Sequence, residues 1–190
     1  MRKLYILSGL IVVIFLTLFI FYSTQWSFSA NLKKYGFNKN NIIKEEGYVL
    51  DHEHLTKILL LKSSDKLAII GLTNYGFGIW KDSVVEGSVE NPDFGEFVTT
   101  GFVINRNRGI NGYYEKHVLV ASYIQNTTNL PHITGNSKYY LNVDYITIND
   151  KVILFAHAIS GRYENIGSTK VISYLEENMG DIIKGNQKNQ

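Results

Sequence analysis

The most suggestive run of ionisable side chains in the sequence is Asp51-His-Glu-His54. If this run lies in a strand, His52 and His54 point to the same face, because side chains alternate along a strand. Two imidazoles on one face can ligate Zn²⁺ or a similar ion when a third donor completes the site. His52 and His54 are therefore the candidate metal ligands, and a polar entry into a strand is the alternative interpretation.

The remaining histidines, His117, His132 and His157, could supply the third ligand, but their spacing in the sequence fixes no distance to the first two. His117 and His157 lie in apolar runs, where a histidine is typically a hydrogen-bonded core or rim residue rather than a catalytic base. The sequence contains no nucleophile elbow, phosphate-binding loop or dinucleotide fingerprint. We therefore assign no catalytic residue and expect no cofactor.

Arginine and tyrosine gather between two apolar runs of the sequence, in a segment dense in turn-forming residues. These residue types anchor many protein interfaces, because they combine a large contact area with hydrogen bonding. A solvated hairpin loop is the alternative interpretation. The candidate partner-binding residues of this segment are Arg106, Arg108, Tyr113 and Tyr114.

The segment from Leu4 to Tyr22 contains no charged residue. As a helix it would span roughly 28 Å, close to the thickness of the hydrocarbon core of a bilayer. The segment therefore predicts a transmembrane helix with the lipid bilayer as its partner. A cleaved signal peptide is the alternative, since Ser27-Phe-Ser29 offers small residues. The apolar run is longer than a signal peptide needs, which favours an uncleaved signal-anchor.

Basic residues predict how this helix is oriented. Arg2 and Lys3 lie directly before it, whereas Lys33, Lys34 and Lys39 follow after a gap. Positive residues close to a membrane helix favour the cytoplasmic side. We expect a cytoplasmic N-terminus and a domain outside the cell membrane, with secretion after signal cleavage as the alternative.

The composition restricts which partners the domain can bind and which covalent cross-links it can form. Without Arg2 and Lys3, the 19 basic residues fall to 17, which equals the number of acidic residues. A neutral domain disfavours nucleic acid as a partner, because phosphate binding relies on positive charge. The chain has no cysteine, which excludes disulfides, thiolate metal sites and a lipid-modified cysteine. The domain must therefore rely on packing.

Changes in polarity along the chain predict four segments. Residues 1–30 form the membrane anchor, and residues 31–47 form a polar, lysine-rich spacer. Residues 48–184 form an extracytoplasmic β-rich domain, and residues 185–190 form a frayed tail.

Short apolar runs separated by turn residues predict an antiparallel sheet of about six or seven strands. Residues 56–62 and 67–73, joined by four polar residues, predict a hairpin. The fold class is therefore α+β: an N-terminal transmembrane helix, an antiparallel β-sheet domain and a C-terminal amphipathic helix. That last helix is indicated by apolar residues every four positions, at Val171, Leu175, Met179 and Ile183.

This overall plan resembles small single-pass membrane-anchored proteins of Gram-positive bacteria that have no assigned function. The resemblance rests on the basic start, one apolar helix, the lack of cysteine, the runs KILLLKSSDKLAIIGLTN and GIWK, and a composition rich in Asn, Lys and Ile. It implies a cell-surface location and no residue roles.

Two functions follow from these observations. The first is a non-enzymatic binding module at the cell surface that recognises an envelope protein, a peptide or a cell-wall component. The alternative is a membrane-anchored, metal-dependent hydrolase that uses the Asp51-His-Glu-His54 run. The hydrolase requires a third ligand and a carboxylate near the two histidines. The lack of catalytic motifs favours the binding module.

Overall fold

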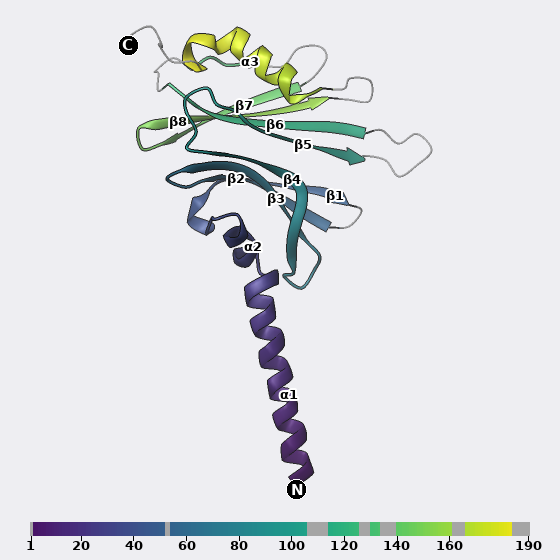
Figure 1. Ribbon diagram of the computed structural model, residues 1–190. Coiled ribbons are helices and arrows are strands. Elements are labelled where there is room, and N and C mark those ends of the chain that lie inside the picture. The colour runs from purple at the N-terminus through teal and green to yellow at the C-terminus, as the bar shows by residue number, and fades with distance from the viewer. Residues whose placement is uncertain are drawn as a thin grey trace.

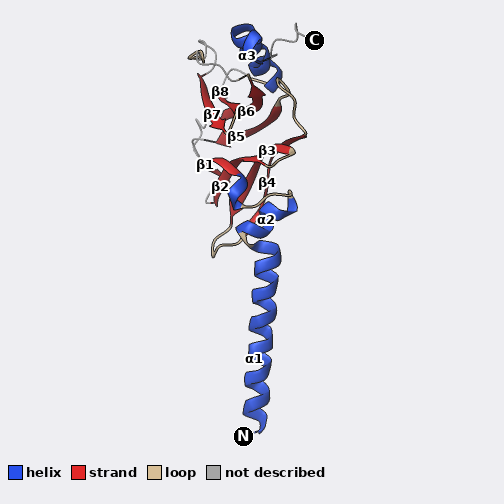
Figure 2. Ribbon diagram, turned by 90° about the vertical axis from the view of Figure 1, so that its left-hand side faces the viewer, coloured by secondary structure: helices blue, strands red, loops and turns tan. Residues whose placement is uncertain are grey.

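The computed structural model describes residues 2–51, 54–105, 114–125, 130–133, 140–160 and 166–183. A long N-terminal helix, α1 (Arg2–Phe21), extends from one end of a layered domain (Figure 1). Starting from that end, the layers are a short helix, two β-sheets and a C-terminal helix, as the rotated view also shows (Figure 2).

The described residues form eight strands in two antiparallel four-stranded sheets. Sheet A has the order β1-β2-β3-β4, with β1 Ile42–Asp51, β2 His54–Lys62, β3 Lys66–Asn74 and β4 Trp80–Glu90. Sheet B has the order β5-β6-β8-β7, with β5 Val98–Asn105, β6 Tyr114–Ile124, β7 Tyr140–Ile148 and β8 Lys151–Ser160.

The predicted α+β class is confirmed, and so is the hairpin, in which Lys62 pairs with Leu67. The expected single sheet of six or seven strands is wrong. Strands such as β2 are covered on both faces: Leu60 packs between the sheets, while Leu59 and Leu61 pack on the helical side. A strand buried on both faces is a continuous apolar run, which does not reveal whether its sheet packs on helices or on a second sheet.

The outer face of sheet B packs on α3 (Ser168–Ile183). The four residues of the predicted apolar stripe on α3 face sheet B. All four are buried there, against residues such as Val120 and Leu154. The C-terminal amphipathic helix is thus confirmed, whereas the predicted tail at 185–190 lies outside the described residues.

The predicted spacer at residues 31–47 is wrong. Helix α2 (Phe28–Lys34) and the chain after it pack on the outer face of sheet A, where Leu32 and Phe37 are buried. Strand β1 then begins at Ile42. The segment looks like a spacer because isolated apolar residues are separated by Lys and Asn, and each apolar residue still fills a place in the core.

Helix α1 is joined to the domain by hydrogen bonds rather than by a flexible linker. It continues through a π-helical turn, Tyr22–Trp26, and Ser27 then caps α2. The buried amide of Asn31 donates to the carbonyl oxygens of Ser27 at 3.0 Å and of Trp80, on β4, at 2.8 Å. One side chain therefore connects the exit of α1 to sheet A.

Candidate functional site

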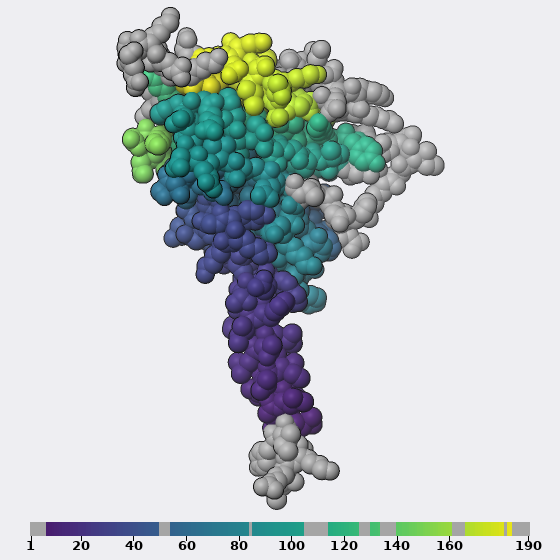
Figure 3. All heavy atoms as spheres, in the orientation of Figure 1, coloured from purple at the N-terminus to yellow at the C-terminus, as the bar shows by residue number. Residues whose placement is uncertain are grey.

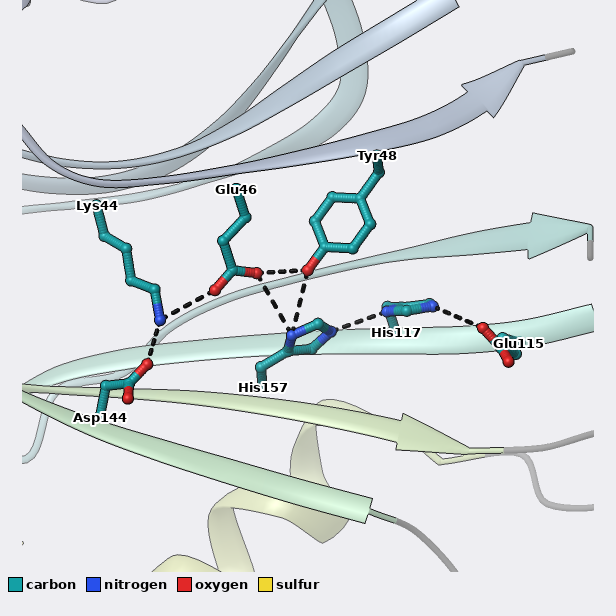
Figure 4. A network of polar contacts seen from close by, with 7 residues as sticks. All are labelled: Lys44, Glu46, Tyr48, Glu115, His117, Asp144 and His157. Carbon is teal, nitrogen blue, oxygen red and sulfur yellow. Dashed lines mark hydrogen bonds and ion pairs between the residues drawn. The ribbon is translucent and has the colours of Figure 1, made fainter. Parts of the chain in front are cut away.

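A chain of polar side chains crosses the space between the two sheets (Figure 4). It includes a pair of histidines, and it comes from one strand of sheet A and three strands of sheet B. We call it the inter-sheet network; its members are Lys44, Glu46, Tyr48, Glu115, His117, Asp144 and His157.

Strand periodicity positions the sheet A members of the network. Lys44, Glu46 and Tyr48 are spaced by two on β1, so all three side chains point to sheet B. Their cross-strand partners on β2 include Leu60 and Ile58, which face the same inter-sheet core.

Strand register brings the two histidines together from β6 and β8. His157 pairs with Leu119, two residues along β6 from His117, so the two imidazoles are diagonal neighbours on one face of sheet B. His117 Nδ1 and His157 Nε2 lie 2.8 Å apart, within hydrogen-bond distance. The His117 ring also stacks on Phe102, with ring centroids 4.7 Å apart.

Each end of the histidine pair faces a carboxylate. His157 Nδ1 lies 3.5 Å from Glu46 Oε2 and 3.3 Å from Tyr48 Oη, and Tyr48 donates a hydrogen bond to the same Glu46 oxygen. His117 Nε2 lies 3.6 Å from Glu115 Oε2. The imidazoles therefore lie between two negative groups.

Lys44 extends the network towards the edge of the sandwich. Its Nζ lies 2.9 Å from Glu46 Oε1 and also forms an ion pair with Asp144 on β7. The same Nζ lies 4.7 Å from the centre of the Phe155 ring. This lysine links the edge strand of sheet A to the edge strand of sheet B.

The network shifts the pKa of two of its members. The hydrogen bond from His157 is the largest cause that lowers the pKa of Glu46 from 4.5 to about 2; burial opposes it, and Tyr48 and Lys44 add to it. Burial works to lower the pKa of Lys44, but the hydrogen bonds to Asp144 and Glu46 outweigh it and raise that pKa. Both groups therefore keep their charge at neutral pH.

We assign the ring protons of the histidine pair from these contacts. Glu46 and Tyr48 favour a proton on His157 Nδ1, so His157 Nε2 accepts from His117 Nδ1. His117 Nε2 faces the Glu115 carboxylate at the other end of the pair.

Burial limits what these imidazoles can do. The side chain of His117 is 1% exposed and that of His157 is 9% exposed, whereas Asp144 at the edge is 39% exposed. A substrate in solution cannot reach either ring. The contacts of the network bind the two sheets to each other. The expectation that His117 and His157 are core or rim residues is confirmed.

The structure tests the predicted metal ligands only in part. His52 lies outside the described residues, and His54 begins β2, with its ring centroid 4.6 Å from that of Tyr75. His132 is exposed. Across the ranges that the structure describes, no three His, Asp or Glu side chains are grouped so that they could hold a metal ion. The metal site at His52 and His54 stays a prediction.

The predicted partner-binding segment is also described only in part. Arg106, Arg108 and Tyr113 lie outside the described residues. Tyr114 is the first residue of β6, and it is 60% exposed. Val103 of β5 is 50% exposed, and it lies on the same face of sheet B.

The sequence reasoning missed the sheet A half of the network. Lys44 and Glu46 lie inside the predicted spacer, and Tyr48 is the first residue of the predicted β-rich domain. The available signal was the spacing itself, since Lys-x-Glu-x-Tyr places three hydrogen-bonding side chains on one face of a strand.

The described chain is thus a sandwich of two antiparallel sheets between helical layers, with a charged network inside it and an apolar helix at one end. Comparisons with protein-family models, curated proteins and solved structures find no match to this chain.

Proposed function

We propose that this chain is a membrane-anchored, non-enzymatic binding module, held outside the cell membrane by α1. The single observation that carries the anchoring is the apolar helix, whose candidate span of 20 residues, Leu7–Trp26, contains an 18-residue window with a mean hydropathy of 2.3. None of the most apolar window of this span is buried by the domain. Figure 3 shows the helix as a shaft that projects from the domain.

Binding rather than catalysis is supported by where the reactive and the apolar side chains lie. The histidine pair is enclosed in the core, whereas Val103 and Tyr114 expose apolar surface on sheet B. Sheet B is the sheet farther from α1 (Figure 1), so a partner can approach this face away from the bilayer. Exposed aromatic and branched side chains favour a protein or peptide as that partner.

The membrane anchor is tested with the variant Val13→Lys/Ile14→Lys. Each lysine near the middle of the helix costs about 2.5–3.5 kcal/mol on insertion, so the variant is expected to leave the membrane fraction. The wild-type chain should float with membranes after an alkaline wash, as should the control Val13→Leu/Ile14→Leu. A wild-type chain that stays in the supernatant uncleaved would remove the basis of the proposal.

The orientation is tested in the same preparation, because the chain has no cysteine of its own. Thr169 is exposed on α3, so Thr169→Cys offers a single thiol. A membrane-impermeant maleimide should label it in intact cells. Labelling that requires cell lysis would place the domain on the cytoplasmic side.

The partner is tested by substituting Tyr114 in the full chain. Tyr114→Ser is expected to reduce recovery of a co-purifying envelope protein or peptide by about tenfold or more, as expected for a residue at the centre of an interface. Tyr140→Ser is the matched control: Tyr140 is 65% exposed, but it lies on β7, at the opposite edge of sheet B. Equal losses for both variants, or no loss for either, would argue against binding at this face.

A further inference from the structure

The turn between β3 and β4 holds the most exposed aromatic side chain among the described residues. Phe77 is 101% exposed, so its ring packs against no other part of the domain. A phenylalanine that contacts nothing in its own domain gains no hydrophobic stabilisation from folding. Its position therefore points to a contact outside the domain.

The backbone of this turn is strained in a way that presents Phe77. Its φ is +50°, a left-handed conformation that is unfavourable for a bulky side chain, and it lies between Gly76 at +93° and Gly78 at +74°. The turn is nevertheless well bonded. Asn74 Oδ1 accepts from the Gly76 amide at 2.8 Å, and the Ile79 amide donates to the Gly76 carbonyl at 2.9 Å. The strained conformation is built into the fold.

The turn lies at the level where α1 enters the domain. Tyr22 Oη donates to the carbonyl oxygen of Gly78 at 3.2 Å. Tyr22 precedes the end of the apolar span at Trp26 by four residues, which is about 6 Å along a helix. Figures 1 and 2 show the loop between β3 and β4 at the end of the domain from which α1 extends.

The surface beside the turn has the chemistry of a membrane interface. A hollow of about 320 Å³ lies between α1 and sheet A, and Trp26, Trp80 and Lys81 are among its lining residues. Lys34 and Asp82 line it as well, as an ion pair of 3.7 Å. Tryptophan favours the headgroup region of a bilayer, and lysine is attracted to anionic headgroups. These residues lie at the same end of the domain as Phe77.

We infer that the β3–β4 turn is a second membrane contact, in which Phe77 inserts into the boundary between headgroups and acyl chains of the leaflet from which α1 emerges. This inference rests on the proposed membrane span of α1. One helix alone leaves the tilt of the molecule relative to the bilayer undetermined. A second contact to one side of the helix axis fixes that tilt, and with it the side of the domain that lies nearest the membrane.

Depth measurements on the full chain in phospholipid vesicles test this contact. Phe77→Cys and the control Thr169→Cys, on the opposite side of the sandwich, each provide the single thiol of the chain. A nitroxide label attached to the thiol at position 77 should collide more often with oxygen, which concentrates in lipid, than with a nickel chelate, which stays in water. The same label at position 169 should collide more often with the nickel chelate. The unlabelled thiol at position 77 should react about tenfold more slowly with a charged maleimide, since a low dielectric disfavours the thiolate.

A second measurement avoids the label. In vesicles, Phe77→Asp should raise the hydrogen-exchange rates of the turn amides about tenfold over wild type, because a charged side chain withdraws the turn from lipid. Phe77→Leu should stay close to wild type.

The outcomes separate the two proposals. If the full chain fails to float with the vesicles, the membrane span is wrong, and this inference falls with it. If the chain floats but the label at position 77 is as accessible to the nickel chelate as the label at position 169, the second contact alone is overturned. Equal exchange in Phe77→Asp and wild type would overturn it as well.

Discussion

Replacing Glu46 with glutamine is expected to lower the free energy of unfolding by about 2–3 kcal/mol at pH 7, because the histidine pair and Lys44 then lose the charge that they face. The loss should depend on pH. The pKa of Glu46 is depressed from 4.5 to about 2 in the folded chain, so its ionised form stabilises the fold fully above pH 4.5. That contribution is lost as the pH falls from 4.5 towards 2, and the two proteins should converge there.

Urea unfolding of the full chain in detergent, followed between pH 7 and pH 3, measures this difference. Glu45→Gln is the matched control, since Glu45 is the neighbouring residue on the other face of β1 and pairs with the partly exposed Lys57. The control should change the stability by no more than about 0.5 kcal/mol. Equal effects of the two substitutions, or a difference that is constant across this pH range, would show that the network does not stabilise the sandwich as described.

The second large effect is expected at Gly87, where β4 passes very close to β5. A Cβ at this position would overlap the carbonyl oxygen of Thr99 and lie 3.1 Å from the carbonyl carbon of that residue. Both atoms belong to the backbone, so no side-chain rotation can relieve the overlap. Gly87→Ala is therefore expected to cost about 3 kcal/mol, because one strand must move away from the other.

The urea midpoint of Gly87→Ala measures this cost. Gly180→Ala is the control: Gly180 lies within α3, and a Cβ there would have no neighbour within 4 Å. The control should gain about 0.5–1 kcal/mol, because alanine favours a helix more than glycine does. If Gly87→Ala unfolded at the wild-type midpoint, the close approach of β4 and β5 would be wrong.

Local sequence signals predicted the parts of the fold that depend on neighbouring residues. The apolar helix, the hairpin of β2 and β3 and the stripe on α3 each follow from a periodicity or a turn within about twenty residues. The buried positions of His117 and His157 followed from their apolar neighbours.

The division into two sheets and the network between them could not be predicted in the same way. Tyr48 and His157 are 109 positions apart, and no local pattern indicates that β1 lies over β8. Moreover, a rule based on residue type predicts that Lys44 and Glu46 are exposed to solvent, because charged side chains are rarely buried. Lys44 and Glu46 pair with each other along β1, but their other partners, Asp144 and His157, lie on strands whose placement depends on the packing of the whole domain. The candidate site therefore becomes visible only in three dimensions.

The hydrogen bonds of Asn31 limit how far the domain could reach for a partner of the kind proposed above. A flexible segment as long as the predicted spacer, residues 31–47, would give a root-mean-square reach of roughly 20 Å. The buried amide and the packed α2 remove that freedom. With α1 in a bilayer, encounters would then depend on lateral diffusion of the whole molecule, and a partner would have to come within the height of the domain itself.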